Sequence, residues 1–218
     1  MPESTTLHEQ FRPRSWSEVI GQDKALARIS ALRRRGLPGR DFWISGASGT
    51  GKTTIAWLLA AEVADDYAIE ELNTNDATAQ RLREIERSEY MMRPIDRRVH
   101  ALIANEAHGL QRDIIRKLLC MLDPVPSHIL WALTTTSESQ DKLFDNLDDA
   151  HPLLSRCVNL PLARRDLAKQ FAAKAREIAT AENLDGRPIG DYVKLSQRCR
   201  NNFRGMLQAV ENGEMIGI

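Results

Sequence analysis

The sequence lacks an excess of charge of either sign, a long apolar run and closely spaced cysteines. Lys plus Arg and Asp plus Glu each number 30 among 218 residues, so the formal net charge is zero. Any nucleic-acid binding therefore has to come from a local patch. No apolar run approaches the length of a membrane span, and the first residues carry no basic-then-apolar signal region. The three cysteines have neither CxxC nor metal-ligand spacing. These absences predict a cytoplasmic protein with no membrane partner and no metal site built from cysteines.

Short apolar runs alternate with helical periodicity along most of the chain. The helical patterns cover residues 24–35, 53–64, 79–90 and 111–122. The apolar runs cover residues 42–45, 67–72, 99–104, 128–135 and 157–160. This alternation is typical of a mostly parallel sheet covered by helices on both faces. It predicts an α/β fold with a five-stranded parallel sheet.

The last quarter of the chain shows helical periodicity only. Apolar residues share one helical face in residues 167–178 and again in residues 203–210, after a candidate cap at Asn201 and Asn202. Between these stretches, Pro188 suits the first turn of a helix. We expect an α/β domain over residues 1–162, followed by a small three-helix domain over residues 163–218.

A glycine-rich segment follows the first expected strand and opens a helical pattern. It reads GASGTGKTT and fits G-x-x-x-x-G-K-[ST]. Glycines let the backbone curl so that successive N–H groups face a phosphate, and the helix N-terminus adds positive potential. Lys52 is expected to reach the terminal phosphates, and the Thr53 hydroxyl to bind Mg²⁺. The alternative, a plain glycine-rich turn, is disfavoured because both flanking elements match the motif. The residues predicted to bind ATP or GTP are Gly46, Ala47, Ser48, Gly49, Thr50, Gly51, Lys52, Thr53 and Thr54.

A second part of the site is expected where the apolar run at residues 99–104 ends. Ligands of parallel α/β folds lie at the carboxyl edge of the sheet, and here Asn105-Glu106 replaces the Asp-Glu that is usual in an ATPase. Glu106 is the candidate base that orients the attacking water. Asn105 replaces the carboxylate that holds the hydration shell of Mg²⁺, and loss of that charge about 4 Å from the ion removes up to ~4 kcal/mol.

Because Thr53 and the nucleotide also hold the ion, we expect tight nucleotide binding with slow, metal-sensitive hydrolysis. The alternative, that Asn105-Glu106 is only a strand end, requires the phosphate motif to be accidental.

Five segments, in the same order, resemble the motifs of clamp-loader ATPases of the AAA+ class. They are FRPRSWSEVIGQ, ELNTNDATAQRLREI, NEAHGLQRDIIRKLLCMLDPVPSHILWALTT, PLLSRCVNL and NNFRGMLQAV. The second is similar to replication factor C small subunits, the third to the tau/gamma subunit of bacterial DNA polymerase III, and the fourth to both. The resemblance implies a P-loop AAA+ domain followed by a helical lid.

The resemblance also implies roles for single residues. The residues it implies in the adenine pocket are Arg12, Pro13, Val19 and Ile20. Thr135 stands at sensor 1, the polar side chain that orients the γ-phosphate and water, and the neighbouring threonines leave this assignment open by one residue. Arg156 corresponds to an arginine finger that enters a neighbouring subunit's site, and Arg204 to the sensor 2 that ties the lid to the γ-phosphate. Such guanidinium groups suit phosphate oxygens. The alternatives are a surface arginine beside a strand and a solvated helix residue.

The resemblance implies DNA contacts by two helices, one within the segment ELNTNDATAQRLREI and one after the acidic motif. The basic residues at the matching positions are Arg81, Arg83, Arg112 and Arg116. Contacts of this kind bind phosphates without reading sequence and weaken with salt. The alternative is that helices with alternating Arg and Glu are solvated faces.

The implied function is a clamp-loader ATPase subunit. It would bind ATP, Mg²⁺ and primer-template DNA in an oligomeric spiral with other clamp-loader subunits, and load a sliding clamp during replication. Its expected location is the cytoplasm, at the nucleoid, or the host cytoplasm for a phage-encoded protein.

The alternative is an ATP-binding, hydrolysis-deficient scaffold subunit of a clamp-loader-like or other AAA+ DNA-remodelling complex. A branch-migration ATPase of the same class is a third hypothesis, which the Ser-Arg-Cys motif disfavours.

Two further features differ from the pattern of the family. The zinc-binding cysteine module of the bacterial subunit is missing from the sequence, and we expect no helical collar domain after the lid. We therefore expect either assembly through the ATPase domains and a partner, or a small divergent loader.

Overall fold

The computed structural model describes residues 6–74, 77–90, 99–136 and 150–217. The chain divides into two compact units, which we call the sheet unit and the helical unit. The sheet unit consists of Lys24–Gly46 and Lys52–Leu162, and the helical unit of Met1–Asp23, Ala47–Gly51 and Ala163–Ile218. The helical unit thus includes the beginning of the chain and the middle of the glycine-rich loop. The expected domains, residues 1–162 and 163–218, stay a prediction.

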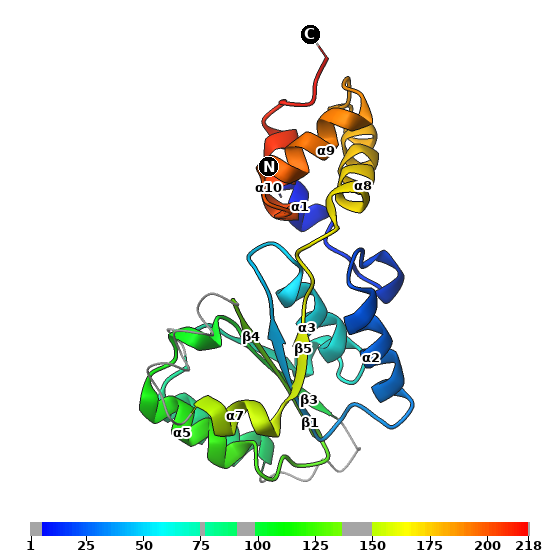
Figure 1. Cartoon of the computed structure of the whole chain (residues 1–218). Coiled ribbons are helices and arrows are strands. Elements are labelled where there is room, and N and C mark those ends of the chain that lie inside the picture. The colour runs from blue at the N-terminus through cyan, green and yellow to red at the C-terminus, as the bar shows by residue number, and fades with distance from the viewer. Residues whose placement is uncertain (1–5, 75–76, 91–98, 137–149, 218) are drawn as a thin grey trace. The chain divides into compact units, whose positions relative to one another are not determined.

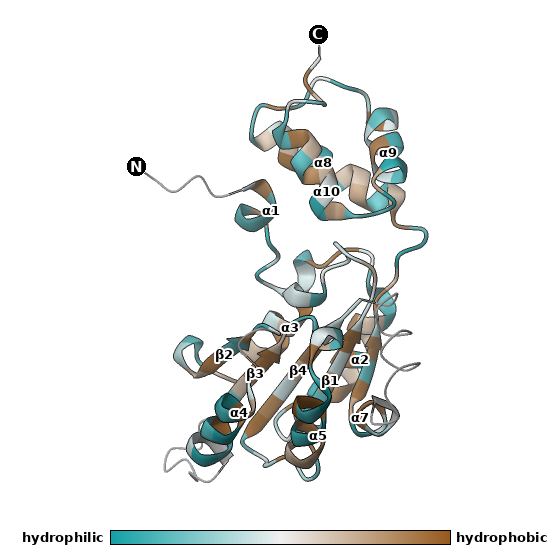
Figure 2. Ribbon diagram, turned by 90° about the vertical axis from the view of Figure 1, so that its left-hand side faces the viewer, coloured by the Kyte–Doolittle hydropathy of each residue, from teal (hydrophilic) through white to brown (hydrophobic). Residues whose placement is uncertain are grey.

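The sheet unit is built on a five-stranded parallel sheet. Its strands are β1 (Arg40–Ser45), β2 (Ile69–Leu72), β3 (His100–Ala104), β4 (Ile129–Thr135) and β5 (Val158–Pro161). They lie in the order β2-β3-β4-β1-β5, and each neighbouring pair is parallel. Every residue of the central strand β4 is buried, as a continuous apolar run predicts, and Figure 2 shows the hydrophobic colouring of β3 and β4. The expected fold class is confirmed.

Helices cover both faces of this sheet (Figure 1). On one face, α4 (Ala79–Ile85), α5 (Arg112–Met121) and α7 (Ala150–Arg156) pack against a core that includes Trp43, Leu102 and Trp131. On the other face lie α2 (Asp23–Arg33) and α3 (Lys52–Ala61). Burial of each large apolar side chain contributes about 1.5–3 kcal/mol. The sheet is therefore a rigid base for the residues that follow the carboxyl ends of its strands.

Several short elements were not expected from the sequence. They are α1 (Leu7–Gln10), α7, the 3₁₀ turns η1 (Trp16–Glu18), η2 (Asp66–Ala68) and η4 (Ala107–Gly109), and the π-helical turn η3 (Glu86–Tyr90). The last of these replaces the second half of the helix expected over residues 79–90. Elements of one or two turns are too short to display a hydrophobic period, which is the signal that a sequence pattern offers.

The helical unit contains α8 (Ala168–Ala181), α9 (Ile189–Arg198) and α10 (Phe203–Glu211). Their apolar faces form one core, which Leu7 of α1 joins. The expected cap is present, since the Asn202 side chain accepts a hydrogen bond from the N–H of Gly205 over 3.1 Å. Pro188 is the N-cap of α9 rather than a residue of its first turn, and its carbonyl accepts from the N–H of Asp191. Among the described residues, no helix has the length and apolar character needed to cross a membrane.

Candidate nucleotide site

The glycine-rich loop joins β1 to α3 at the carboxyl edge of the sheet. Its N–H at Gly46 donates to the carbonyl of Thr135 over 3.3 Å, so the loop leaves β1 beside the end of β4. Gly49 and Gly51 have φ angles of +74° and +93°, which side chains disfavour and glycine adopts freely. Lys52, the first residue of α3, is 7% exposed. A curled backbone that ends in a helix N-terminus is the geometry that a phosphate requires.

Asn105 is the centre of a hydrogen-bond cluster beside this edge. Its Oδ1 accepts from the hydroxyls of Thr53 and Thr134, over 3.4 and 3.1 Å. Its Nδ2 donates to Oε1 of Glu71 in β2. The backbone N–H of Asn105 donates to the carbonyl of Leu72 over 2.9 Å, which extends the pairing of β2 and β3 by one residue. The structure therefore brings together Thr53 and Asn105, the two residues expected near Mg²⁺.

Glu106 has a left-handed backbone conformation, with φ 54° and ψ 42°. Such a conformation is uncommon outside glycine and is found preferentially at functional sites. The N–H of Glu106 donates to Thr134 Oγ1 over 3.2 Å, and its carbonyl accepts from the hydroxyl of Thr74. Its carboxylate lies 3.3 Å from Nδ1 of His108 and is half exposed. The candidate base is thus held in place by its backbone while its side chain stays accessible to water.

The two threonines at the end of β4 have different partners. Thr134 contacts both Asn105 and Glu106 through its hydroxyl. The hydroxyl of Thr135 lies 3.3 Å from Nδ1 of His108 and donates to the carbonyl of Thr136. Adjacent strand residues point to opposite faces of a sheet, which is why the two hydroxyls separate. Thr134 contacts the acidic motif directly, whereas Thr135 reaches Glu106 only through His108. Sensor 1 at Thr135 stays a prediction.

The sequence pattern indicates no role for two residues of this cluster, Glu71 and His108. Both lie within segments that resemble the motifs of the family. Glu71 reaches Asn105 only because β2 lies beside β3, and His108 reaches Glu106 only because the chain turns through η4. No sequence spacing indicates either contact.

Oxygen ligands suit Mg²⁺, which is usually held by one or two protein side chains together with phosphates and water. The Thr53 hydroxyl and Asn105 Oδ1 offer such oxygens 3.4 Å apart. In the described part of the chain, no group of three or more His, Cys, Asp or Glu side chains could hold a metal on its own. The residues present therefore fit a cation that arrives with a nucleotide, and the ion would supply charge neutralisation at the phosphates.

Arg156, the expected arginine finger, is the last residue of α7. Its Nε donates to Oδ2 of Asp123 over 2.9 Å, and its Nη1 donates to the carbonyl of Pro152. It precedes β5, whose first residue pairs with Phe42 near the start of β1. Arg156 therefore lies toward the amino edge of the sheet, whereas the glycine-rich loop leaves the carboxyl edge.

Several of the other expected residues belong to the helical unit. Gln22 donates to the carbonyls of Thr50 and Ala163, over 3.4 and 3.1 Å, and accepts from the N–H of Ala163. Ile20 packs against the helical core. Arg12, Pro13 and Val19 are partly exposed, and Arg204 in α10 is exposed. The segment expected at the adenine is thus tied to the loop expected at the phosphates.

Gly49 lies directly against the N-cap of α10. A Cβ atom at this position would lie 1.9 Å from Oδ1 of Asn202. The N–H of Phe203 also donates to the carbonyl of Gly49 over 3.4 Å. Only glycine fits this contact, so the loop needs glycine here for its packing as well as for its φ angle.

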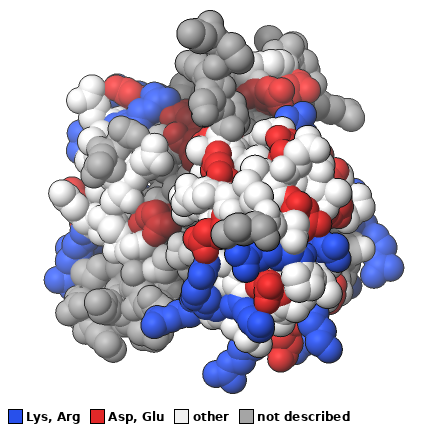
Figure 3. Space-filling view, turned by 90° about the horizontal axis from the view of Figure 1, so that it is seen from above, with Lys and Arg blue, Asp and Glu red and all other residues white. Residues whose placement is uncertain are grey.

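The four arginines expected at DNA have different surroundings. Arg81 donates to Glu70 over 2.6 and 3.0 Å and to Glu84 over 3.2 Å, and these hydrogen bonds, that of Glu70 first, raise the pKa of its guanidinium. Arg83, Arg112 and Arg116 are exposed. On the face seen in Figure 3, basic and acidic side chains are intermingled. Phosphate contacts at these positions stay a prediction.

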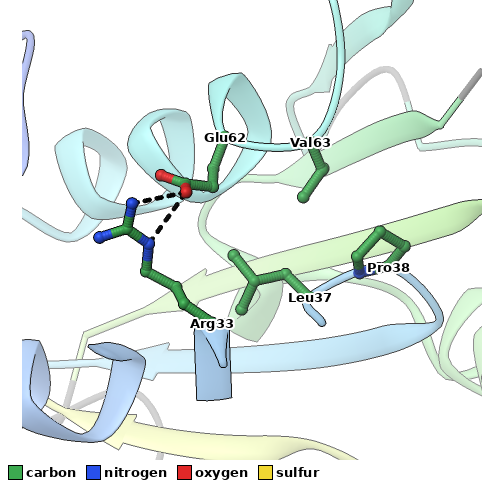
Figure 4. A pocket seen from close by; sticks show the side chains of 5 residues that line it. All are labelled: Arg33, Leu37, Pro38, Glu62 and Val63. Atoms are coloured by element: carbon green, nitrogen blue, oxygen red, sulfur yellow. Dashed lines mark hydrogen bonds and ion pairs between the residues drawn. The ribbon is translucent and has the colours of Figure 1, made fainter. Parts of the chain in front are cut away.

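A separate hollow of about 330 Å³ lies at the far ends of α2 and α3 (Figure 4). It is lined by Arg33, Leu37, Pro38, Glu62 and Val63. Arg33 donates to Glu62 through both Nε and Nη2, over 2.9 and 2.6 Å. Since α3 begins at Lys52 and the hollow lies beyond its last residue, this hollow is not the expected phosphate site.

Known proteins are similar to this chain in sequence. The tau/gamma subunit of DNA polymerase III from Haemophilus influenzae is 24% identical over 97% of this chain and 32% of its own length. The gamma subunit from Buchnera aphidicola is 28% identical over 97% of this chain and 62% of its length. Replication factor C small subunit 1 from Pyrobaculum arsenaticum is 29% identical over 81% and 52%. The chain is similar to AAA+ clamp-loader ATPase subunits. It spans about a third of the length of the first of these relatives, and no protein-family model matches it.

Solved structures of RuvB from Thermotoga maritima share the fold. One point mutant of that protein superimposes with a TM-score of 0.71 at 19% identity, covering 93% of this chain and 65% of that chain. The Holliday junction branch migration motor gives 0.64 at 20% identity, covering 92% and 64%. At these identities the likeness shows the fold alone and does not favour branch migration as a function.

Proposed function

We propose that this chain is a clamp-loader-like ATPase subunit that binds ATP with Mg²⁺. In this proposal it assembles with other clamp-loader subunits around primer-template DNA in the cytoplasm and acts on a sliding clamp. The single observation that carries the proposal is the cluster at the carboxyl edge of the sheet. There Thr53, the second residue of α3, lies in one hydrogen-bond network with Asn105 and Glu106. Similarity to clamp-loader subunits over nearly the whole chain supports the same assignment.

The position of Arg156 supports catalysis between subunits. β1 has six residues, and at about 3.3 Å per residue it separates the two edges of the sheet by roughly 17 Å. An arginine at the amino edge is therefore poorly placed to reach phosphates at the carboxyl edge of its own chain. A neighbouring chain can present the carboxyl edge of its own sheet to Arg156. A finger supplied in trans is worth about 10³–10⁵ in rate, and it makes hydrolysis depend on assembly.

The test is the mass of the assembly with and without ATP, in the presence of primed DNA and millimolar Mg²⁺. We expect a monomer or small oligomer without nucleotide, and a larger ring or spiral with ATP and DNA. A chain that stays monomeric with ATP, and whose DNA affinity does not change with nucleotide, would contradict the proposal.

A second candidate follows from Asn105 itself. With a neutral carboxamide where a carboxylate is usual, the chain would hold ATP as a scaffold, and turnover would come from partner subunits. Turnover measured in the complete assembly separates the two candidates. DNA-stimulated hydrolysis that is lost on Glu106→Gln supports the ATPase, while hydrolysis that does not depend on Glu106 supports the scaffold.

A further inference from the structure

The carboxamide of Asn105 is bonded at both of its ends. The oxygen accepts from the hydroxyls of Thr53 and Thr134. The nitrogen donates to the carboxylate of Glu71 in the neighbouring strand. The two ends therefore face chemically different partners, and rotation of the group by 180° would break these bonds.

Glu71 is itself held from α3. Nε1 of Trp57 donates to Oε2 of Glu71 over 2.9 Å. Trp57 lies four residues after Thr53 in the same helix, so the two side chains project from one helical face. The side chains of Thr53, Asn105, Glu71 and Trp57 thus form a ring that closes through the backbone of α3 and joins α3, β2 and β3.

A carboxylate only accepts hydrogen bonds, whereas a carboxamide both donates and accepts. Glu71 can therefore bond only the nitrogen of Asn105, which directs the oxygen to Thr53. We propose that Glu71 is a positioning residue that fixes the Asn105 carboxamide with its oxygen toward the Thr53 hydroxyl. That is the side on which an Mg²⁺ ion bound with ATP would need an acceptor. The identity of the ion rests on the proposed function, while the orientation rests on the hydrogen bonds.

The same ring explains why asparagine suits position 105 in this chain. A carboxylate there would lie at hydrogen-bond distance from that of Glu71, and like charges so placed repel. In Asn105→Asp alone, the charge added beside the ion and the repulsion from Glu71 therefore oppose one another. Exchanging the two groups, by Glu71→Gln with Asn105→Asp, keeps every bond. The nitrogen at position 71 then donates to the carboxylate at 105, and the oxygen at position 71 accepts from Trp57.

The experiment compares the native chain with Glu71→Gln, Asn105→Asp and the exchanged pair. ATP affinity is measured by calorimetry in millimolar Mg²⁺ and again in EDTA. Because a hydrogen bond to a charged group is worth roughly tenfold in an equilibrium constant, Glu71→Gln should weaken binding in Mg²⁺ about tenfold. The exchanged pair should bind Mg²⁺-ATP about tenfold more tightly than Asn105→Asp alone, because it removes the repulsion and keeps every hydrogen bond. The native chain and Glu71→Gln should agree in EDTA.

The control is Glu70→Gln in the adjacent residue of β2, whose carboxylate bonds Arg81 instead. It should leave the Mg²⁺ dependence unchanged. An exchanged pair that binds Mg²⁺-ATP no more tightly than Asn105→Asp alone, or a Glu71→Gln variant with native Mg²⁺ dependence, would overturn the inference.

A second readout does not require nucleotide. In ¹⁵N spectra, the indole N–H of Trp57, assigned with Trp57→Phe, and the side-chain NH₂ of Asn105 should both shift in Glu71→Gln. Unshifted signals would overturn the inference even if the chain bound no ATP. If the native chain binds no ATP in millimolar Mg²⁺ but these signals shift, the proposed function fails and the positioning role of Glu71 stands.

Discussion

The guanidinium of Arg156 is engaged by Asp123 of its own chain, with Nε 2.9 Å from Oδ2. A finger that enters a neighbouring site has to leave this carboxylate first. The contact is partly exposed, and such ion pairs are worth about 0.2–1 kcal/mol. We therefore expect Asp123→Asn to raise ATP turnover of the assembled protein by up to about fivefold, measured at saturating ATP and DNA. Unchanged or reduced turnover would show that Asp123 does not compete for Arg156.

Complementation between two inactive variants tests whether Arg156 acts in trans. Arg156→Ala keeps its phosphate site and Lys52→Ala keeps its arginine, so a mixed assembly contains some sites with both groups. The expected result is little turnover from either variant alone and clear turnover from an equal mixture. A mixture no more active than its components would argue that Arg156 serves no neighbouring copy.

Lys52 should determine nucleotide affinity. Lys52 is the first residue of α3 and directly follows the glycine-rich loop, where a phosphate would bind. Lys52→Ala should weaken ATP binding by at least about tenfold in calorimetry, since a charged hydrogen bond is worth roughly 1.5–3 kcal/mol. The control is Lys24→Ala, an exposed lysine in the first turn of α2, which should leave the affinity as it is. Equal affinities in all three proteins would contradict the site.

Asp41 should make stability fall as pH rises. Burial, with a smaller contribution from the nearby charge of Asp123, raises the pKa of Asp41 from 3.8 to about 7, and its Oδ1 has no hydrogen-bond partner. The folded state therefore favours the protonated acid. The stabilisation is complete below pH 3.8 and is lost as pH rises through about 7.

Asp41→Asn removes this group. Relative to that variant, the native unfolding free energy should drop by up to about 4 kcal/mol between pH 4 and pH 8, measured by urea unfolding. A constant difference between the two proteins across this range would contradict the raised pKa.

Gly49→Ala should destabilise the protein beyond the strain of its φ angle. A methyl group there overlaps Asn202, which would lose its cap on α10. Left-handed strain costs about 1–2 kcal/mol and a lost N-cap about 1 kcal/mol. Gly36→Ala is the matched control, because Gly36 has a φ of +88° and no atom within 4 Å of an added Cβ. Thermal unfolding should show a clearly larger loss for Gly49→Ala, and equal losses would mean that the contact with Asn202 is unimportant.

Much of the fold could be predicted because its signals are local. Each strand of the sheet coincides with an apolar run, and α2, α3 and α5 coincide with helical periods. The N-cap at Asn202 was predicted from residue type alone, because its hydrogen bond spans three residues. α7 was missed because seven residues are too few to show a period.

The phosphate loop was determined by the sequence itself, because every group that it needs lies within nine consecutive residues. Asn105 and Glu106 could likewise be placed at the end of a strand. What surrounds them was decided by tertiary structure. The contact of Glu71 with Asn105 exists because β2 lies beside β3, and the separation of Thr134 from Thr135 follows from the register of β4. Strand order and register depend on how the whole chain packs, so no stretch of sequence contains them.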